Sequence, residues 1–144
     1  MNAGPRDVTL EPGFVLHARP YRDTSLLVEL LTRDHGRVGA VARGVRSRRS
    51  RLAGLLQPLQ PLALSWRSRG ELGALRAAEP AGRPFLLRGR RLVSGLYANE
   101  LLIRLLGRED PHPGLFERYL AMLEGLAEGV AEAVALRAFE RDLL

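Results

Sequence analysis

The segment Ser25-Leu-Leu-Val-Glu-Leu-Leu-Thr-Arg-Asp-His-Gly-Arg-Val-Gly-Ala-Val-Ala42 decides the fold class. Its first eight residues form a nearly continuous apolar run, broken by Glu29, as in a buried strand. His35-Gly36 predicts a turn, after which apolar residues alternate onto one face of residues 37–42. Gly39 allows a bend in this second strand, or a close approach of another group to its backbone. The segment therefore predicts two short strands joined by a turn.

Three further strands are expected around this pair. Residues 14–19 alternate between two faces, and residues 61–66 place three large apolar side chains on one face. A turn at residues 68–70 leads into a last strand at residues 71–78, and a helical turn is expected at residues 52–57. Five short strands at this spacing predict a small barrel. A five-stranded barrel of this size suggests an OB-fold, whose open face and loops commonly bind single strands.

The hydrophobic period changes after the proline-containing break at residues 80–84. Apolar residues recur at helical spacing over residues 90–106 and 115–127, and again from Val130 onward. The third of these predicted helices reaches Leu144 without a stop signal. We therefore expect the helical part to continue further than this sequence does.

These patterns predict an α+β protein with two domains. Residues 1–82 are expected to form a five-stranded OB-fold β-barrel that binds nucleic acid. Residues 83–144 are expected to form an α-helical domain, which we expect to be incomplete. A hydrophobic content of 46% with 26% charged residues is that of an ordinary globular protein.

The charge of the chain is concentrated in its first half. All 22 basic residues are arginine, which indicates a coding bias, so the placement of the arginines is stronger evidence than their identity. Residues 1–83 carry 14 arginines and 7 acids, whereas residues 84–144 carry 8 arginines and 9 acids. The formal net charge of +6 therefore arises in the predicted barrel.

The densest cluster is Arg43-Gly-Val-Arg-Ser-Arg-Arg-Ser-Arg51, with five arginines and no acid in nine residues. Such a cluster repels itself unless an anion is expected nearby. Phosphate fits best, because the planar guanidinium group matches two phosphate oxygens, and Ser47 can add a neutral hydrogen bond. Nucleic acid is therefore the first partner to consider, with an ordinary solvated basic loop as the alternative.

Two aromatic residues are candidates for stacking on bases. Trp66 precedes Arg67 but shares a face with Leu62 and Leu64, which favours a place in the core. Tyr21, in the turn after the first strand, is the aromatic residue that we expect to be exposed. Its sequence context alone does not single it out as a stacking platform.

The residues that most enzymes need are missing or badly spaced. The chain has no cysteine, and its three histidines lack metal-ligand spacing. The glycines do not form a phosphate-binding loop, and no serine has the context of a nucleophile. We therefore expect no catalytic site, no metal and no cofactor. The sequence contains neither the apolar core of a signal peptide nor a membrane span, so we expect a cytoplasmic protein, and its partner of choice, nucleic acid, predicts association with the nucleoid.

Seven segments, in order, have a familiar pattern: Phe14-Val-Leu-His-Ala-Arg-Pro-Tyr21, Asp23-Thr-Ser-Leu26, Gly36-Arg-Val38, Ala42-Arg-Gly-Val-Arg-Ser-Arg-Arg-Ser50, Leu56-Gln-Pro-Leu59, Ser94-Gly-Leu-Tyr-Ala-Asn-Glu-Leu-Leu102 and Leu136-Arg-Ala-Phe-Glu-Arg-Asp-Leu-Leu144. Together they resemble the amino-terminal part of the bacterial DNA repair protein RecO family. The arginine block followed by Leu-Gln-Pro is the most specific part, and the resemblance covers residues 14–144.

The resemblance implies a recombination mediator that binds single- and double-stranded DNA and anneals complementary strands. It implies that the protein works with RecR to help RecA replace single-strand-binding protein (SSB) on DNA. It also implies binding of the acidic, Phe-ended tail of SSB by the helical domain, with Arg137 as the candidate contact. The DNA contacts implied on this sequence are Arg37, Arg43, Arg46, Arg48, Arg49 and Arg51, to which we add Ser47.

Two other functions remain open at this point. The basic loop of a protein-interaction module of the replication and repair machinery would bind an acidic peptide instead of nucleic acid. An RNA-binding OB-fold of translation or RNA processing would have similar charges. Competition between DNA and RNA strands of one sequence separates the second of these from a DNA-binding protein.

Overall fold

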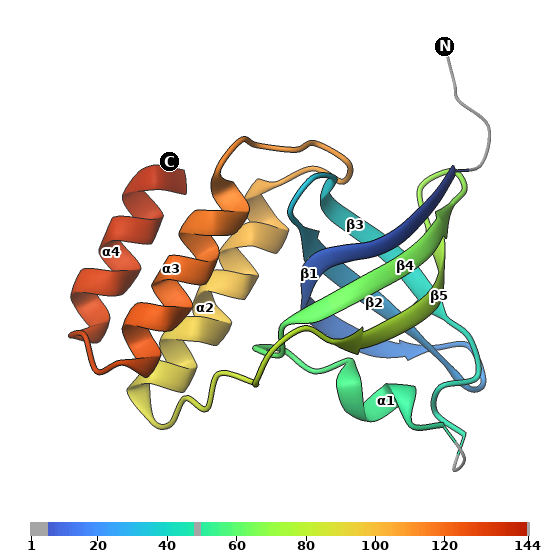
Figure 1. The fold of residues 1–144 in the computed structure, drawn as a ribbon, viewed down its shortest axis with the longest axis horizontal. Coiled ribbons are helices and arrows are strands. Elements are labelled where there is room, and N and C mark those ends of the chain that lie inside the picture. Colours follow the sequence, from blue (N-terminus) through green and yellow to red (C-terminus); the bar gives the residue numbers. More distant parts are fainter. Residues whose placement is uncertain (1–5, 48–49, 144) are drawn as a thin grey trace.

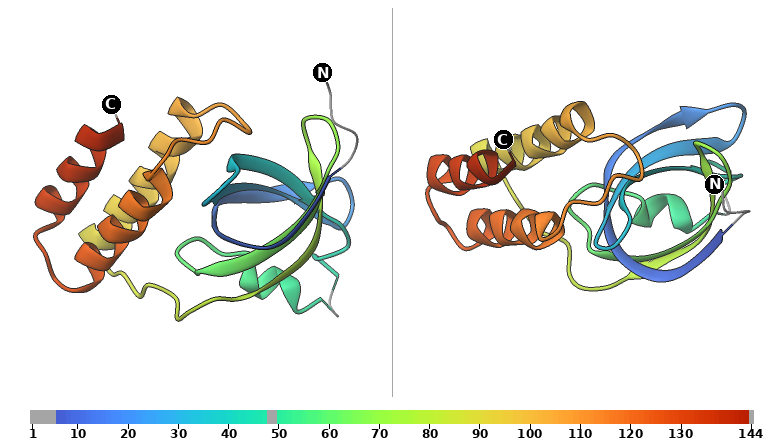
Figure 2. Two further views of the ribbon diagram at one scale, coloured as in Figure 1. Left: turned by 45° about the horizontal axis from the view of Figure 1, so that its top comes forward. Right: turned by 90° about the horizontal axis from the view of Figure 1, so that it is seen from above.

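The computed structural model describes residues 6–47 and 50–143. Within these ranges five strands close a barrel, and three helices pack against one side of it (Figures 1 and 2). The elements are β1 (Arg6–Tyr21), β2 (Ser25–Thr32), β3 (Gly36–Ala42), α1 (Leu52–Leu55), β4 (Leu62–Ser68), β5 (Gly73–Pro80), α2 (Arg90–Leu105), α3 (Leu115–Ala127) and α4 (Glu132–Leu143). None of the helices in these ranges is long and apolar enough to cross a membrane.

The strands follow the order β1-β2-β3-β5-β4 around the barrel. Neighbouring strands are antiparallel except β3 and β5, which run parallel through the pairs Ala40–Gly73 and Val41–Ala74. The short helix α1 lies between β3 and β4 in the sequence and beneath the barrel in Figure 1. This is the arrangement of an OB-fold, so the predicted α+β class, with a barrel followed by helices, is confirmed.

The first strand is the main difference from the sequence prediction. It begins at Arg6 instead of residue 14, whereas the other predicted ends differ by no more than two residues. Pro12 and Gly13 resemble a break, but β1 continues through them and passes there from pairing with β4 to pairing with β2. A β-carbon on Gly13 would lie 2.7 Å from the Leu64 side chain and 2.9 Å from the Leu31 carbonyl oxygen. Position 13 therefore requires glycine, because β2 and β4 both pair with this residue.

The interior of the barrel is one of two hydrophobic clusters. It contains side chains from β2, β3 and β4, among them the fully buried Leu30 and Leu64. Trp66 belongs to this cluster with 2% of its surface exposed, so its predicted place in the core is confirmed. The ring of His35 packs edge-on against the indole ring, with centroids 5.5 Å apart.

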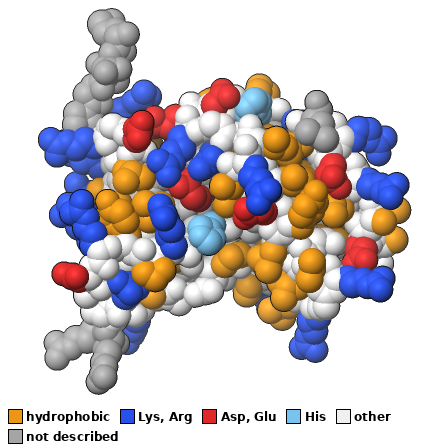
Figure 3. Space-filling view, turned by 180° about the vertical axis from the view of Figure 1, so that it is seen from behind, with side chains coloured by type: hydrophobic (Ala, Val, Ile, Leu, Met, Phe, Trp, Pro, Cys, Tyr) orange, Lys and Arg blue, Asp and Glu red, His pale blue; other side chains and the backbone are white. Residues whose placement is uncertain are grey.

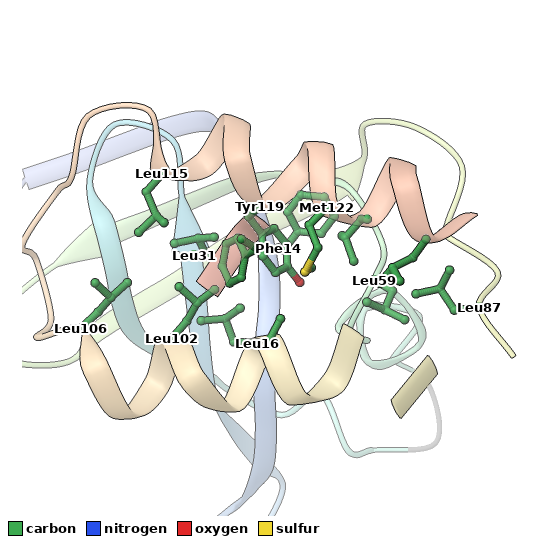
Figure 4. Packing of buried hydrophobic residues seen from close by; sticks show 14 residues of the cluster. Phe14, Leu16, Leu31, Leu59, Leu87, Leu102, Leu106, Leu115, Tyr119 and Met122 are labelled. Carbon is green, nitrogen blue, oxygen red and sulfur yellow. The ribbon is translucent and has the colours of Figure 1, made fainter. Parts of the chain in front are cut away.

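The second cluster joins the barrel to the helices (Figure 4). Phe14 and Leu16 of β1 and Leu31 of β2 contribute buried side chains, which meet Leu102 of α2 and Tyr119 of α3. The rings of Phe14 and Tyr119 pack edge to face, with centroids 5.1 Å apart. The helices are therefore held to the barrel by a shared core rather than tethered by a linker alone.

A buried polar link lies inside this shared core. The Tyr119 hydroxyl donates a hydrogen bond to the Asn99 side-chain oxygen, and the Asn99 amide nitrogen donates to the Leu16 carbonyl at 3.3 Å. Burial raises the pKa of Tyr119 well above its usual value. The phenol therefore stays protonated and remains a donor. Helices α2 and α3 and strand β1 are joined by this chain of bonds.

Replacing Tyr119 by phenylalanine should lower the free energy of unfolding by about 1 to 2 kcal/mol. The substitution keeps the buried ring but leaves the Asn99 oxygen without its donor. Urea unfolding followed by circular dichroism measures the effect. Tyr97→Phe is the matched control, because Tyr97 is 45% exposed, and it should change stability by less than about 0.5 kcal/mol. Equal effects of the two substitutions would contradict the role given to the buried hydroxyl.

Candidate nucleic-acid interface

An open groove of about 930 Å³ lies at one end of the barrel. Its walls come from the β1–β2 turn, the end of β3, the end of β4 and the start of β5. No aspartate or glutamate lines it among residues 6–47 and 50–143, whereas five arginines do: Arg22, Arg43, Arg67, Arg69 and Arg76. We call this surface the arginine groove.

Barrel closure brings these arginines together. The parallel pairs between β3 and β5 place the end of β3 beside the start of β5, so Arg43 and Arg76 line one groove. Alternation along β4 sends Trp66 into the core and Arg67 outward, where it is paired with Ala74 of β5. Arg69 follows in the β4–β5 connection. Segments far apart in the sequence thus form one basic surface.

Little negative charge offsets the groove. In the described part of the chain, the one ion pair made by a groove arginine joins Arg67 and Asp7 at 3.7 Å, with both side chains largely exposed. Exposed pairs of this kind contribute little to stability. Figure 3 shows basic side chains along the barrel edge of one face and also along its helical edge, with a group of hydrophobic side chains over the helices. Four of the five guanidinium groups thus keep donors available for an anion such as phosphate.

Arg46, whose predicted contact with DNA stays a prediction, holds the β1–β2 turn through hydrogen bonds within the protein. Its Nε donates to the Ser25 carbonyl at 3.0 Å, and one Nη donates to the carbonyls of Arg22 at 2.8 Å and Asp23 at 2.5 Å. The backbone N–H of Arg46 also donates to the Thr24 carbonyl at 2.9 Å. Arg46 therefore positions one wall of the groove, and most of its donors are used within the protein.

Arg37, another predicted DNA contact, is used at the junction of barrel and helices. Its Nε donates to a Glu29 oxygen at 2.9 Å, and one Nη donates to the carbonyls of Ile103 at 2.7 Å and Leu106 at 2.6 Å. These carbonyls are at the end of α2, where a positive charge is favourable. Only 15% of the Arg37 side chain is exposed, so its donors serve this junction in the structure, and its contact with DNA stays a prediction.

Glu29 joins a second arginine in the same cluster. Arg108 donates to both carboxylate oxygens of Glu29, whose side chain is 8% exposed. Glu29 pairs with Gly39 of β3, where a β-carbon would lie 2.7 Å from Arg108 Nε. Gly39 therefore leaves room for Arg108 to cross the strand, which confirms the predicted close approach at this glycine.

The remaining predicted DNA contacts lie in the segment after β3. Arg43 lines the arginine groove, and Ser47 and Arg51 are exposed. Arg48 and Arg49 lie outside the described residues. The contacts of these five residues with DNA stay predictions.

Four groove arginines were not among the sequence candidates: Arg22, Arg67, Arg69 and Arg76. Each stands apart from the dense arginine cluster, so charge counting along the chain does not single it out. One usable signal was the alternation of β4, because an inward Trp66 places Arg67 on the outside. Assigning the other three required knowledge of which strand ends meet.

Arg137, the predicted contact for the SSB tail, is exposed on α4. A separate hollow of about 240 Å³ lies between α3 and α4 and is lined mainly by apolar side chains. The neighbouring Ala138 and Phe139 line this hollow, as do the charged residues Arg118 and Asp142, but Arg137 does not. The predicted contact is therefore adjacent in sequence to the hollow rather than inside it.

Comparison with known proteins assigns both parts of the chain. Residues 7–83 match the family described as Recombination protein O N terminal, and residues 86–144 match Recombination protein O C terminal. The chain belongs to the RecO family. The matches meet near the predicted division of the chain at residues 82 and 83.

Several RecO relatives are similar over nearly the whole chain. Proteins named DNA repair protein RecO are 52% identical in Burkholderia pseudomallei over 93% of this chain and 50% identical in Ralstonia nicotianae over 95% of it. The protein of that name from Coxiella burnetii is 51% identical over 95% of the chain. The matches cover 49%, 50% and 59% of those relatives, so the chain spans about half their length.

Replacing Glu29 by glutamine should lower the free energy of unfolding at pH 7 by about 2 to 3 kcal/mol. The change leaves Arg37 and Arg108 without their shared counter-charge in a partly buried place. Burial alone would raise the pKa of Glu29, but hydrogen bonds from Arg108 and Arg37 and their positive charges outweigh it and hold the pKa below its usual 4.5. The stabilisation by the ionised carboxylate is therefore fully present above about pH 4.5 and is lost as pH falls through the lowered pKa.

Urea unfolding at several pH values measures this difference. The gap between the wild type and Glu29→Gln should be constant near neutral pH and begin to narrow as pH falls below 4.5, where Glu29 of the unfolded chain becomes protonated. It should be closed once pH is below the lowered native pKa, where the native carboxylate is also neutral. Glu100→Gln is the control, because the exposed pair of Glu100 with Arg104 is worth little. A gap independent of pH would show that the charge of Glu29 does not stabilise the junction.

Proposed function

We propose that this RecO-family chain binds DNA through the arginine groove and acts in DNA repair and recombination. The observation that carries the proposal is the gathering of five arginines, with no lining acid, at one end of an OB barrel. The family supports DNA as the polyanion, because the relatives are named DNA repair proteins. The groove and the family membership are independent lines of support, one from charge and shape and the other from sequence similarity.

The physical basis of binding is phosphate neutralisation. Guanidinium groups follow the sugar–phosphate backbone and release condensed counterions, so affinity falls steeply with salt. Contacts of this kind carry little base information, so sequence preference is low and both single- and double-stranded DNA are ligands. Neutralised strands also repel one another less, which favours annealing of complementary strands. Positioning and neutralisation need no catalytic group, so the proposed role is not enzymatic.

The wider proposal places the chain in a recombination mediator. Such a protein works with RecR and helps RecA to load on SSB-coated DNA. The helical part contributes a contact with the acidic SSB tail, for which α4 offers Arg137 beside the apolar hollow, and Arg118 lies in the hollow itself. The apolar lining suits an aromatic ring at the end of a peptide. Positive charge for the terminal carboxylate comes from the exposed Arg137 and from Arg118, whose Nε lies 3.9 Å from the Asp142 carboxylate in the same hollow.

The test is binding of residues 1–144 to a labelled single-stranded oligonucleotide, measured by fluorescence anisotropy across a salt series. Five phosphate contacts at about 0.7 each give a slope of about −3.5 for log K against log salt. The double reversal Arg43→Glu with Arg69→Glu should weaken binding at least tenfold and reduce the slope by about 1.4. Arg141→Glu is the charge-matched control for each of the two single reversals, since this exposed arginine lies on α4, beyond the other helices from the barrel (Figure 1).

The outcomes separate the proposal from its competitors. Equal losses for the groove reversal and the Arg141 control would mean that net charge, rather than the groove, drives binding. Salt-insensitive or absent binding would favour a groove that recognises an acidic protein segment. Displacement of the DNA by an equal concentration of RNA of the same sequence would favour an RNA-binding protein.

A further inference from the structure

We propose that Tyr21 and Arg22 in the β1–β2 turn form a platform on which an unpaired base stacks. The inference rests on the proposed function, because it assumes that a nucleic-acid strand occupies the arginine groove. It adds a specificity that phosphate contacts cannot supply. A groove with such a platform prefers strands whose bases are accessible over strands whose bases are paired in a duplex.

The first observation is the position of the tyrosine ring. Tyr21 is partly buried and is the one aromatic residue among the described residues that line the groove. The Arg22 guanidinium carbon lies over this ring, 5.2 Å from its centroid. Aromatic rings and guanidinium planes both stack on nucleobases. Every base can stack in this way, so the contact does not depend on the DNA sequence, and neither do phosphate contacts.

The second observation is that the turn is held in a strained conformation. Arg22 has a φ of +55°, in the left-handed region that favours glycine. A residue with a side chain keeps this conformation only where its surroundings enforce it. Arg46 provides the constraint, because its side chain binds three carbonyls of residues 22–25 and its backbone N–H binds a fourth.

The third observation is the arrangement of charge around the ring. Arg43, Arg69 and Arg76 line the same groove as Tyr21, so phosphates bound by these arginines bring their bases close to the turn. A duplex keeps its bases paired and stacked inside, where they cannot reach a side chain on the barrel surface. A single strand can turn one base onto the platform while its backbone stays on the arginines.

Abasic oligonucleotides test the platform directly, because they keep every phosphate and lack the bases. We would measure anisotropy of residues 1–144 with a labelled oligothymidylate and with an abasic strand of equal length. The wild type should bind the base-containing strand at least about fivefold more tightly. Tyr21→Leu should remove this preference, with the salt slope unchanged, and Tyr21→Phe should keep it. Tyr97→Leu, at an exposed tyrosine of α2, is the matched control and should also keep it.

Each result decides between the two proposals. Equal affinity of the wild type for the two strands, with a steep salt slope, would overturn the platform and leave the arginine groove intact. A preference for bases that persists in Tyr21→Leu would also overturn it, because the bases would then be recognised elsewhere. If the wild type shows no salt-dependent binding to either strand, the proposed function and the platform are both overturned. Thermal unfolding of each variant checks that it is folded. The comparison of the two strands with the wild type does not depend on any variant.

Discussion

Two residue pairs between β3 and β5 close the barrel, and the proposed interface depends on this closure. Ala40 meets Gly73 and Val41 meets Ala74, which turns an open sheet into a barrel with no free edge at that point. Closure also brings the ends of β3, β4 and β5 together with the β1–β2 turn. Barrel closure is what makes neighbours of arginines that are widely separated in the sequence. An anion bound in the groove would offset the repulsion among these clustered arginines.

A second set of contacts fixes the helices to this barrel. The carboxylate of Glu29 binds Arg37 and Arg108, and Arg37 also binds carbonyls at the end of α2. Arg108 reaches Glu29 across Gly39, where the absence of a side chain leaves room for its guanidinium group. The hydrophobic core shared by the barrel and the helices also holds the two parts together. The groove and the helices are therefore parts of one packed body. Ligands on the barrel and on the helical part would be held at a defined separation, which suits a protein proposed to act between DNA and other proteins.

The sequence predicted the fold closely because the deciding signals are local. Strand β2 and helix α3 have the predicted ends, and the alternation of β4 identified Trp66 as a core residue. Which arginines share one surface was predicted less completely, because this grouping depends on contacts between distant segments. Charge counting cannot tell that the donors of Arg37 and Arg46 are taken by carbonyl groups, nor that Arg22 and Arg76 face the same groove. Such assignments need the register and closure of the barrel, which no single segment encodes.

The most direct test of the central claim is to map bound DNA on the protein, residue by residue. Uniformly ¹⁵N-labelled protein would be titrated with a short single-stranded oligonucleotide while amide chemical shifts are followed. The account predicts that the largest changes occur at the β1–β2 turn, at the end of β3 and along residues 67–76, with small changes in α4. Changes confined to the helices, with the groove residues unaffected, would contradict the assignment of the arginine groove as the DNA-binding surface.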